Sequence, residues 1–224
     1  MFGADGNDGK SLVFDLNKFR MFHAIILFKN IEKRKRYASY WRRLQIFKKF
    51  VDATYLPLPY NSSGMKTLIL LSAIPGSGKS TWAKNYKAYH DNTFIVASDE
   101  VRERVSGSVQ NFEHEDLVWE TFLADIHKYG KLDNVTVIAD ATNLQNAYRR
   151  YYYEQTPEFD RHVLVLFNIP FEICAAQNKL REPDRVVSDE GMRRLFEEFE
   201  EPTQEILDLY DEYRFIGKSF SIVK

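Results

Sequence analysis

Short apolar runs alternate along most of the chain with segments in which apolar residues recur at the spacing of an α-helix. The runs predict strands at residues 67–71, 93–97, 135–139, 163–167 and 220–223. The recurring positions predict helices at residues 79–88, 117–126, 148–154, 171–180, 189–199 and 203–210. Strands that alternate with helices indicate an α/β fold, with a doubly wound parallel sheet covered on both faces.

The first 64 residues follow a different pattern. Between residues 37 and 51, aromatic and apolar side chains lie at helical spacing with lysines and arginines among them, which predicts a basic amphipathic helix. The stretch 56–64 contains two prolines and ends in a glycine, which is typical of a linker. We therefore predict a mostly helical, basic N-terminal extension at residues 1–64 and a second domain at residues 65–224.

The formal net charge of −1 conceals an asymmetry between these two parts. Residues 1–66 carry 13 Lys/Arg and 5 Asp/Glu, a net charge of +8, whereas the remainder has a net charge of −9. Three interpretations of the basic segment stay open: an arm that binds nucleic acid, an extension that packs on the second domain, or a leader absent from the native product. The third arises because Met65 begins a stretch typical of a natural start. The acidity of the second domain argues against a broad nucleic-acid surface but not against a narrow basic tunnel.

No feature of the sequence points to a membrane or to a secretory pathway. The longest apolar run, at residues 24–28, is far shorter than the roughly 18 residues of a membrane span, and no signal peptide is evident. The single cysteine, Cys174, excludes an intramolecular disulfide and is predicted to pack as a small buried residue. We therefore expect a cytoplasmic protein without a membrane partner.

The strongest chemical signal is the run Ala-Ile-Pro-Gly-Ser-Gly-Lys-Ser-Thr at residues 73–81, between a predicted strand and a predicted helix. Gly76 and Gly78 leave room for backbone N–H groups around an anion, and the positive end of the next helix points at the same anion. Ala73 stands where the usual motif has its first glycine. The run therefore predicts an ATP-binding P-loop, or Walker A motif, made of Pro75, Gly76, Ser77, Gly78, Lys79, Ser80 and Thr81.

Within this loop, Lys79 is expected to reach the β- and γ-phosphates, and the Ser80 hydroxyl to bind Mg²⁺. Asp99 follows the second predicted strand, on the edge where doubly wound folds bind ligands, and could accept a proton from a hydroxyl substrate. Capping of a helix is the alternative role for Ser98 or Asp99. Two arginines in the link between helices, Arg181 and Arg185, fit a mobile clamp on an anion, and a solvated surface is the alternative.

These motifs together resemble the kinase domain of the bacteriophage polynucleotide 5′-hydroxyl kinase family over about 150 residues. The loop 75–83 is similar to that family's phosphate loop, and the segment from Asp99 to Arg102 is similar to its Asp-x-x-Arg motif. The resemblance implies that Asp99 is the general base and that Arg102 holds a substrate phosphate. The lid that contacts ATP phosphates corresponds to Asn178, Arg181 and Arg185. Asp140 begins a segment similar to the family's Asp-Thr-Asn, but Ala141 interrupts it, so a catalytic role for Asp140 stays open.

Four histidines and the segment 149–153 are predicted to have structural rather than catalytic or binding roles. Four of the five histidines, at positions 90, 114, 127 and 162, lack metal-ligand spacing and are predicted to lie at the surface. The segment 149–153 mixes arginines with tyrosines, which could stack on bases, but a helix with one packed and one solvated face is favoured.

The sequence thus predicts an ATP- and Mg²⁺-dependent phosphotransferase with Lys79, Asp99, Arg102 and Arg185 as catalytic residues. The favoured acceptor is a polynucleotide 5′-hydroxyl end. Two alternatives remain: a P-loop kinase of a small-molecule or tRNA-linked acceptor, and a nucleotide-binding regulatory module with little turnover. DNA or RNA as acceptor and the oligomeric state are left open.

Overall fold

The computed structural model describes residues 64–217. The predicted N-terminal extension at residues 1–64, Gly64 apart, lies outside the described residues, and so does the strand predicted at residues 220–223. The predicted domain boundary after residue 64 therefore stays a prediction.

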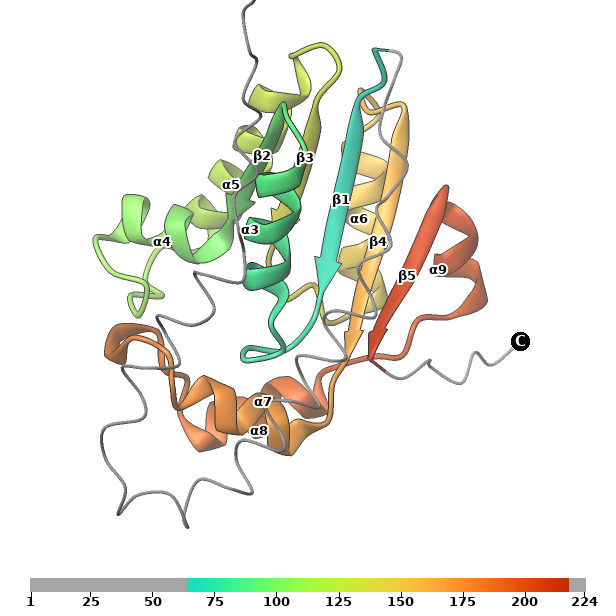
Figure 1. Cartoon of the computed structure of the whole chain (residues 1–224). Helices are drawn as coiled ribbons and strands as arrows, with labels where there is room; N and C mark the ends of the chain where they lie inside the picture. Colours follow the sequence, from blue (N-terminus) through green and yellow to red (C-terminus); the bar gives the residue numbers. More distant parts are fainter. Residues whose placement is uncertain (1–63, 218–224) are drawn as a thin grey trace, which may run out of the picture. The chain divides into compact units, whose positions relative to one another are not determined.

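Five parallel strands form one sheet in the order β2-β3-β1-β4-β5 (Figure 1). The strands are β1 (Thr67–Ser72), β2 (Thr93–Ala97), β3 (Thr136–Asp140), β4 (Arg161–Asn168) and β5 (Glu212–Gly217). The first four agree with the predicted strands, and the predicted α/β fold with a parallel sheet is confirmed. The edge strand β5 was missed, because its sequence Glu-Tyr-Arg-Phe-Ile-Gly is only partly buried and lacks a continuous apolar run.

Helices connect the strands on both sides of the sheet (Figure 1). They are α3 (Lys79–Tyr89), α4 (Ser98–Ser106), α5 (Glu115–Gly130), α6 (Asn146–Gln155), α7 (Phe171–Asn178), α8 (Asp189–Glu197) and α9 (Gln204–Leu209), with a short 3₁₀ turn η2 (Pro183–Arg185). Among the described residues, no helix has the length and apolar character needed to cross a membrane.

Strand β1 shows why both faces of the sheet are covered. All six of its residues are buried, and successive side chains point to opposite faces. Leu68 and Leu70 pack in one core with Phe122 of α5, whereas Ile69 and Leu71 pack in a second core that includes residues of α3, α7 and α8. A continuous apolar run is therefore what this position requires.

Parallel strands bring all of their carboxyl ends to one edge of the sheet, which is where open α/β folds bind ligands. The phosphate loop follows β1 at this edge, and α7 and α8 lie across the same end of the sheet (Figure 1). The candidate site is therefore assembled from loops that follow different strands.

Candidate active site

The predicted phosphate loop occupies the turn between β1 and α3. Gly76 and Gly78 have φ angles of 76° and 91°, in the left-handed region that favours glycine. Gly78 is the N-cap of α3, and no side chain caps the helix. The first backbone N–H groups of α3 are therefore available to an anion, as a phosphate site requires.

Gly76 also allows a close contact between the phosphate loop and helix α7. A Cβ atom at this position would lie 2.1 Å from the carbonyl oxygen of Cys174 and 3.0 Å from the backbone nitrogen of Asn178. The loop therefore packs against the backbone of α7 at a distance that a side chain would prevent. Cys174 is fully buried, as predicted, and burial raises the pKa of its thiol to about 12.

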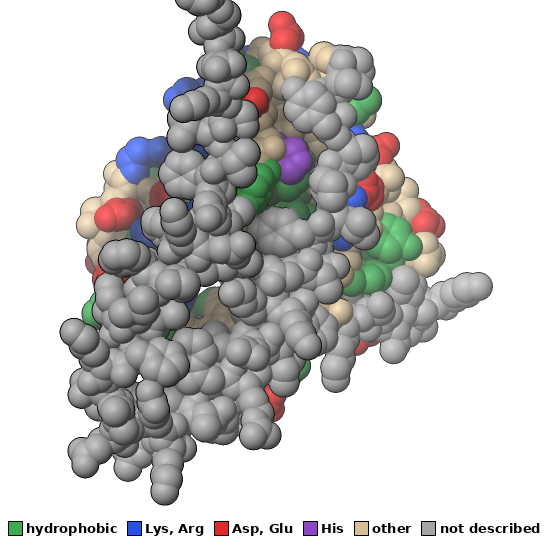
Figure 2. Space-filling view, viewed as in Figure 1, with side chains coloured by type: hydrophobic (Ala, Val, Ile, Leu, Met, Phe, Trp, Pro, Cys, Tyr) green, Lys and Arg blue, Asp and Glu red, His purple; other side chains and the backbone are tan. Residues whose placement is uncertain are grey.

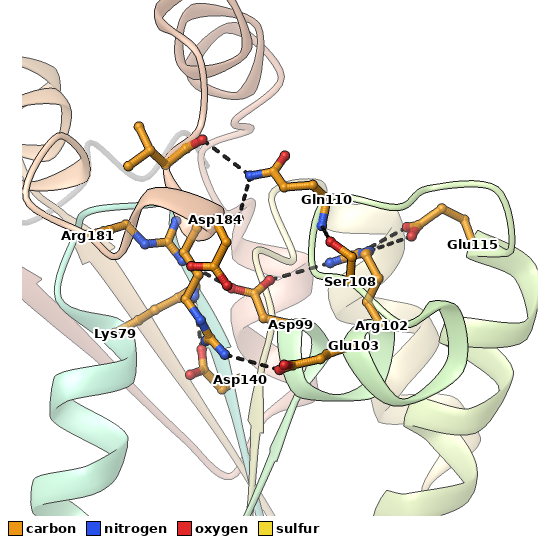
Figure 3. A network of polar contacts seen from close by, with 12 residues as sticks. Lys79, Asp99, Arg102, Glu103, Ser108, Gln110, Glu115, Asp140, Arg181 and Asp184 are labelled. Carbon is orange, nitrogen blue, oxygen red and sulfur yellow. Dashed lines mark hydrogen bonds and ion pairs between the residues drawn. The ribbon is translucent and has the colours of Figure 1, made fainter.

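Lys79 forms an ion pair with Asp140, with its Nζ 3.1 Å from the carboxylate Oδ1 (Figure 3). Asp140 is the last residue of β3, the strand beside β1, and only 4% of it is exposed. The same Oδ1 is buried and accepts no hydrogen bond of normal geometry within the described part of the chain. The tertiary structure thus brings Asp140, whose role the sequence left open, to the phosphate loop.

The residues beside the loop fit Mg²⁺. Hydroxyl and carboxylate oxygens are the ligands that this ion prefers, and the buried Asp140 Oδ1 lacks a full set of partners. In P-loop enzymes Mg²⁺ is held by the Ser/Thr of the loop and by a strand-end aspartate. Ser80, in the first turn of α3, and Asp140 are the residues that would hold the ion here.

Asp99 lies in the first turn of α4, immediately after β2. The N-cap of α4 is Ala97, and no side chain caps this helix, so neither Ser98 nor Asp99 takes the alternative capping role. The carboxylate instead contacts two arginines, with Nη1 of Arg102 at 3.4 Å and Nη2 of Arg181 at 3.1 Å (Figure 3).

Arg102 is more enclosed than its predicted role at a substrate phosphate suggests, with 6% of the residue exposed. Its Nε and Nη2 donate to the two carboxylate oxygens of Glu115, at 2.6 and 3.1 Å. The ring of Phe112 covers the guanidinium, with 4.9 Å between the ring centroid and Cζ. Sequence reasoning missed Glu115 and Phe112, because neither stands in a motif.

The lid is the segment between α7 and α8, and Asn178 closes its base. The Asn178 amide donates to the carbonyl oxygen of Val187 at 2.7 Å and accepts from the Val187 N–H at 3.1 Å. Between these two residues the lid carries Arg181, which contacts Asp99, and Arg185, which lies 3.6 Å from the carboxylate of Glu103. The side chain of Gln110 donates to the lid carbonyl of Asp184 at 2.7 Å (Figure 3).

A cleft of about 1070 Å³ is lined by Lys79 and by residues of α4 and the lid. The predicted site residues that line it are Pro75, Lys79, Asp99, Arg102, Arg181 and Arg185. The other residues of the phosphate loop, in the turn and at the start of α3, are not among those that line the cleft, and Thr81 is exposed. The structure thus gathers groups that lie more than 100 positions apart in the sequence around one space.

A buried arginine contacts the end of β1, just before the phosphate loop. Arg149 of α6 is fully buried, and it donates to the Ser72 hydroxyl at 3.2 Å and to the Leu144 carbonyl at 2.7 Å. Burial lowers the pKa of this guanidinium to about 10. Helix α6 has one packed and one solvated face, as predicted. Arg149 lies on the packed face together with Tyr152.

One of the predicted surface histidines is buried. His162 is 6% exposed, and its Nε2 lies 2.9 Å from the hydroxyl of Thr156. Burial lowers the pKa of its imidazole. The surface prediction was wrong at this position because β4, on which His162 stands, lies inside the sheet rather than at its edge.

The strand order and the phosphate loop define a P-loop kinase-like α/β fold. The sequence model described as an AAA domain (AAA_33) matches residues 68–204. This is more than half of the chain, and the chain therefore belongs to the AAA domain family.

Several solved structures are similar to this one at low sequence identity. A chain of the Pnkp1/Rnl/Hen1 RNA repair complex is 20% identical, with a TM-score of 0.53, over 69% of this chain and 49% of that chain. A gluconokinase from Sinorhizobium meliloti is 16% identical, with a TM-score of 0.47, over 70% and 86% of the two chains. A shikimate kinase from Acinetobacter baumannii is 15% identical, with a TM-score of 0.46, over 71% and 87%. The chain thus spans about half of the matched RNA repair chain and most of both small-molecule kinases.

Proposed function

We propose that this protein transfers the γ-phosphate of ATP to a hydroxyl acceptor, and that a polynucleotide 5′-hydroxyl end is its preferred acceptor. One observation carries the proposal. Lys79 of the phosphate loop, the carboxylate of Asp99 and two lid arginines line the same cleft. Phosphoryl transfer requires this combination, because the protein contributes mainly position and charge stabilisation rather than covalent chemistry.

In this proposal, the N–H groups at the start of α3 and the Lys79 ammonium hold the phosphates of ATP. Ser80 and Asp140 would hold Mg²⁺, which supplies charge neutralisation at the β- and γ-phosphates. Arg181 and Arg185 would grip phosphate oxygens with paired N–H groups once they leave Asp99 and Glu103. Lys79 would likewise exchange part of its contact with Asp140 for phosphate.

On the acceptor side, Asp99 takes the proton of the attacking hydroxyl. A carboxylate within hydrogen-bond reach is the group that a general base requires, and about a third of the Asp99 side chain is exposed to the cleft and its surroundings. Arg102 keeps N–H groups that neither Glu115 nor Asp99 engages, and with these it would hold a phosphate of the acceptor. Its burial restricts that contact to a group that enters the cleft.

The choice of a polynucleotide rests on the Asp-x-x-Arg motif at Asp99 and Arg102. The likeness to a chain of an RNA repair complex is in keeping with it but concerns the fold alone. On the part of the visible face that described residues form, positive and negative side chains lie interspersed (Figure 2).

Label transfer from γ-labelled ATP tests the proposal. The protein is incubated with Mg²⁺ and with DNA and RNA strands that carry a 5′-hydroxyl, and matched 5′-phosphorylated strands serve as the control. We expect label on the hydroxyl strands only, and its loss in Asp99→Asn. Label on small hydroxyl acceptors but not on strands would instead identify a small-molecule kinase. ATP binding without transfer to any acceptor would identify a regulatory module.

A further inference from the structure

The acceptor side of the cleft has an apolar wall beside Asp99. Val109, Phe112 and Trp119 line the cleft together with Arg102. Val109 is buried, whereas Phe112 leaves 59% of its surface exposed. Of the large hydrophobic side chains that are exposed in the described part of the chain, Phe112 is the one that lines the cleft, where a ligand could cover it.

Phe112 is held in place on both sides along the chain. Its neighbour Asn111 donates to the carbonyl oxygen of Ser106 at 3.1 Å and accepts from the N–H of Glu113 at 3.0 Å. Gln110 donates to the lid carbonyl of Asp184, so the loop that carries the ring is also tied to the lid. These bonds fix the backbone on either side of the exposed ring.

Arg102 gives the ring a fixed support. Its guanidinium lies 4.9 Å from the ring centroid, and Glu115 holds that guanidinium with two hydrogen bonds. The same guanidinium lies 3.4 Å from the carboxylate of Asp99. A single side chain therefore separates the exposed ring from the group that would receive the proton of the acceptor.

We propose that Phe112 is the platform on which the terminal nucleobase of the acceptor stacks, and that it selects acceptors whose hydroxyl belongs to a nucleoside. The inference rests on the proposed function and deepens it. In a nucleoside the ribose lies between the 5′-oxygen and the base. Here the Arg102 side chain lies between the Asp99 carboxylate and the ring of Phe112. Every base has a π-face, so such a platform accepts any terminal base.

The three side chains of this wall suit a flat base better than a polyhydroxylated acceptor, whose hydroxyl groups would have to pair with polar groups around the wall, such as Arg102 and Gln110. A site that recognises several hydroxyl groups needs several polar side chains to pair with them, since buried unpaired groups are costly. The valine and the two aromatic residues of this wall offer only the indole N–H of Trp119 as a donor. An aromatic base matches this surface better than a sugar acid does.

The test measures KM and kcat for two 5′-hydroxyl strands, one with a normal terminal nucleotide and one whose terminal nucleotide lacks its base. For Phe112→Ala, KM for the normal strand is expected to rise roughly 5- to 150-fold, the value of one lost stack, while KM for ATP stays unchanged. KM for the strand without the base should not rise further, because that strand has no stack to lose. Phe112→Trp should restore the normal strand.

Tyr89→Ala is the matched control, since Tyr89 is an exposed aromatic residue at the far end of α3 from the phosphate loop. It should leave every constant unchanged. Equal losses on both strands in Phe112→Ala would mean that the ring only supports Arg102, and this would overturn the platform while the proposed function stands. Absence of transfer by the wild-type protein to either strand would overturn both.

Discussion

At the scale of single residues, Asp140 is a buried charged group beside the phosphate loop. Its carboxylate is almost fully buried, and Lys79 is the cation that faces it. A buried charge that loses its partner destabilises a protein strongly. In the proposed function Lys79 would have two tasks, because it pairs with Asp140 in the free protein and would bind phosphates when ATP is present.

Lys79→Met is expected to abolish phosphoryl transfer and to lower the free energy of unfolding by about 3 kcal/mol, because Asp140 is left unpaired. The double variant Lys79→Met/Asp140→Asn should regain most of the stability but none of the activity. Denaturant unfolding and label transfer measure the two effects separately. Near-wild-type transfer by a folded Lys79→Met protein would refute the assignment of the phosphate loop.

Asp99→Asn is expected to lower kcat by about 10²–10⁴-fold with little change in KM for ATP, because asparagine keeps the shape but cannot take a proton. Asparagine still accepts from one of the two arginines, Arg102 or Arg181, but turns its NH₂ group toward the other. The fold should persist, because about a third of the Asp99 side chain is exposed. Steady-state kinetics together with a melting curve check this. A variant that melts early, or that turns over normally, would leave Asp99 with a structural role alone.

At the scale of elements, the phosphate loop packs tightly against helix α7. The contact depends on Gly76, where a side chain would meet the backbone of α7. The lid itself is closed at its base by Asn178 and carries its arginines toward α4. Changes in this region are therefore expected to affect nucleotide binding and lid position together.

Gly76→Ala should lower the free energy of unfolding by about 3 kcal/mol or more, because a Cβ atom would lie 2.1 Å from the Cys174 carbonyl oxygen. ATP binding should be lost as well. Gly107→Ala is the matched control, since Gly107 has the same φ of +76° but nothing within 4 Å of its Cβ position. It should cost only about 1 kcal/mol, from backbone strain. Equal losses of stability in the two variants would show that strain, not the contact with α7, makes Gly76 necessary.

Arg185→Lys should reduce kcat/KM for ATP by roughly tenfold, because lysine offers a point charge where arginine grips a phosphate with two N–H groups. The measurement is steady-state kinetics with ATP varied. Arg104→Lys changes an arginine that is also paired with a carboxylate, Asp125, and that does not line the cleft. It should be silent, and unchanged kinetics in both variants would place Arg185 on the solvated surface.

At the scale of the whole molecule, charge is distributed unevenly along the chain. Residues 1–66 carry a net charge of +8, and the remainder carries −9. Single-stranded nucleic acid attracts lysines and arginines, and each neutralised phosphate releases counterions, so such binding weakens steeply with salt. The basic segment can therefore be tested as a binding arm without reference to its conformation.

A protein that begins at Met65 should keep ATP binding and the chemical step but bind long 5′-hydroxyl strands more weakly, with a shallower dependence on salt. Titration of a labelled strand at several salt concentrations measures this. Earlier melting or aggregation of the shortened protein would instead indicate that residues 1–64 pack on the second domain. Equal strand affinity and equal salt slope in the two proteins would exclude the binding arm.

The sequence by itself determined the features that depend on neighbouring residues. The continuous apolar runs indicated four of the five described strands, because a parallel strand buried on both faces needs such a run. The phosphate loop could also be predicted from the sequence, because its glycines and its lysine lie close together in the chain. The same holds for the lid arginines, which stand in one short link.

Only the tertiary structure decided which distant groups meet. Lys79 meets Asp140 because β3 pairs with β1, and Arg181 meets Asp99 across 82 positions because the lid lies over the end of β2. The spacing of apolar residues along the chain does not determine the order of the strands in the sheet, so neither contact could be predicted from the sequence. For the same reason the burial of Arg149, the strand β5 and the contact between Phe112 and Arg102 became visible only in the folded chain. Each of them depends on what packs beside a residue rather than on its neighbours in the sequence.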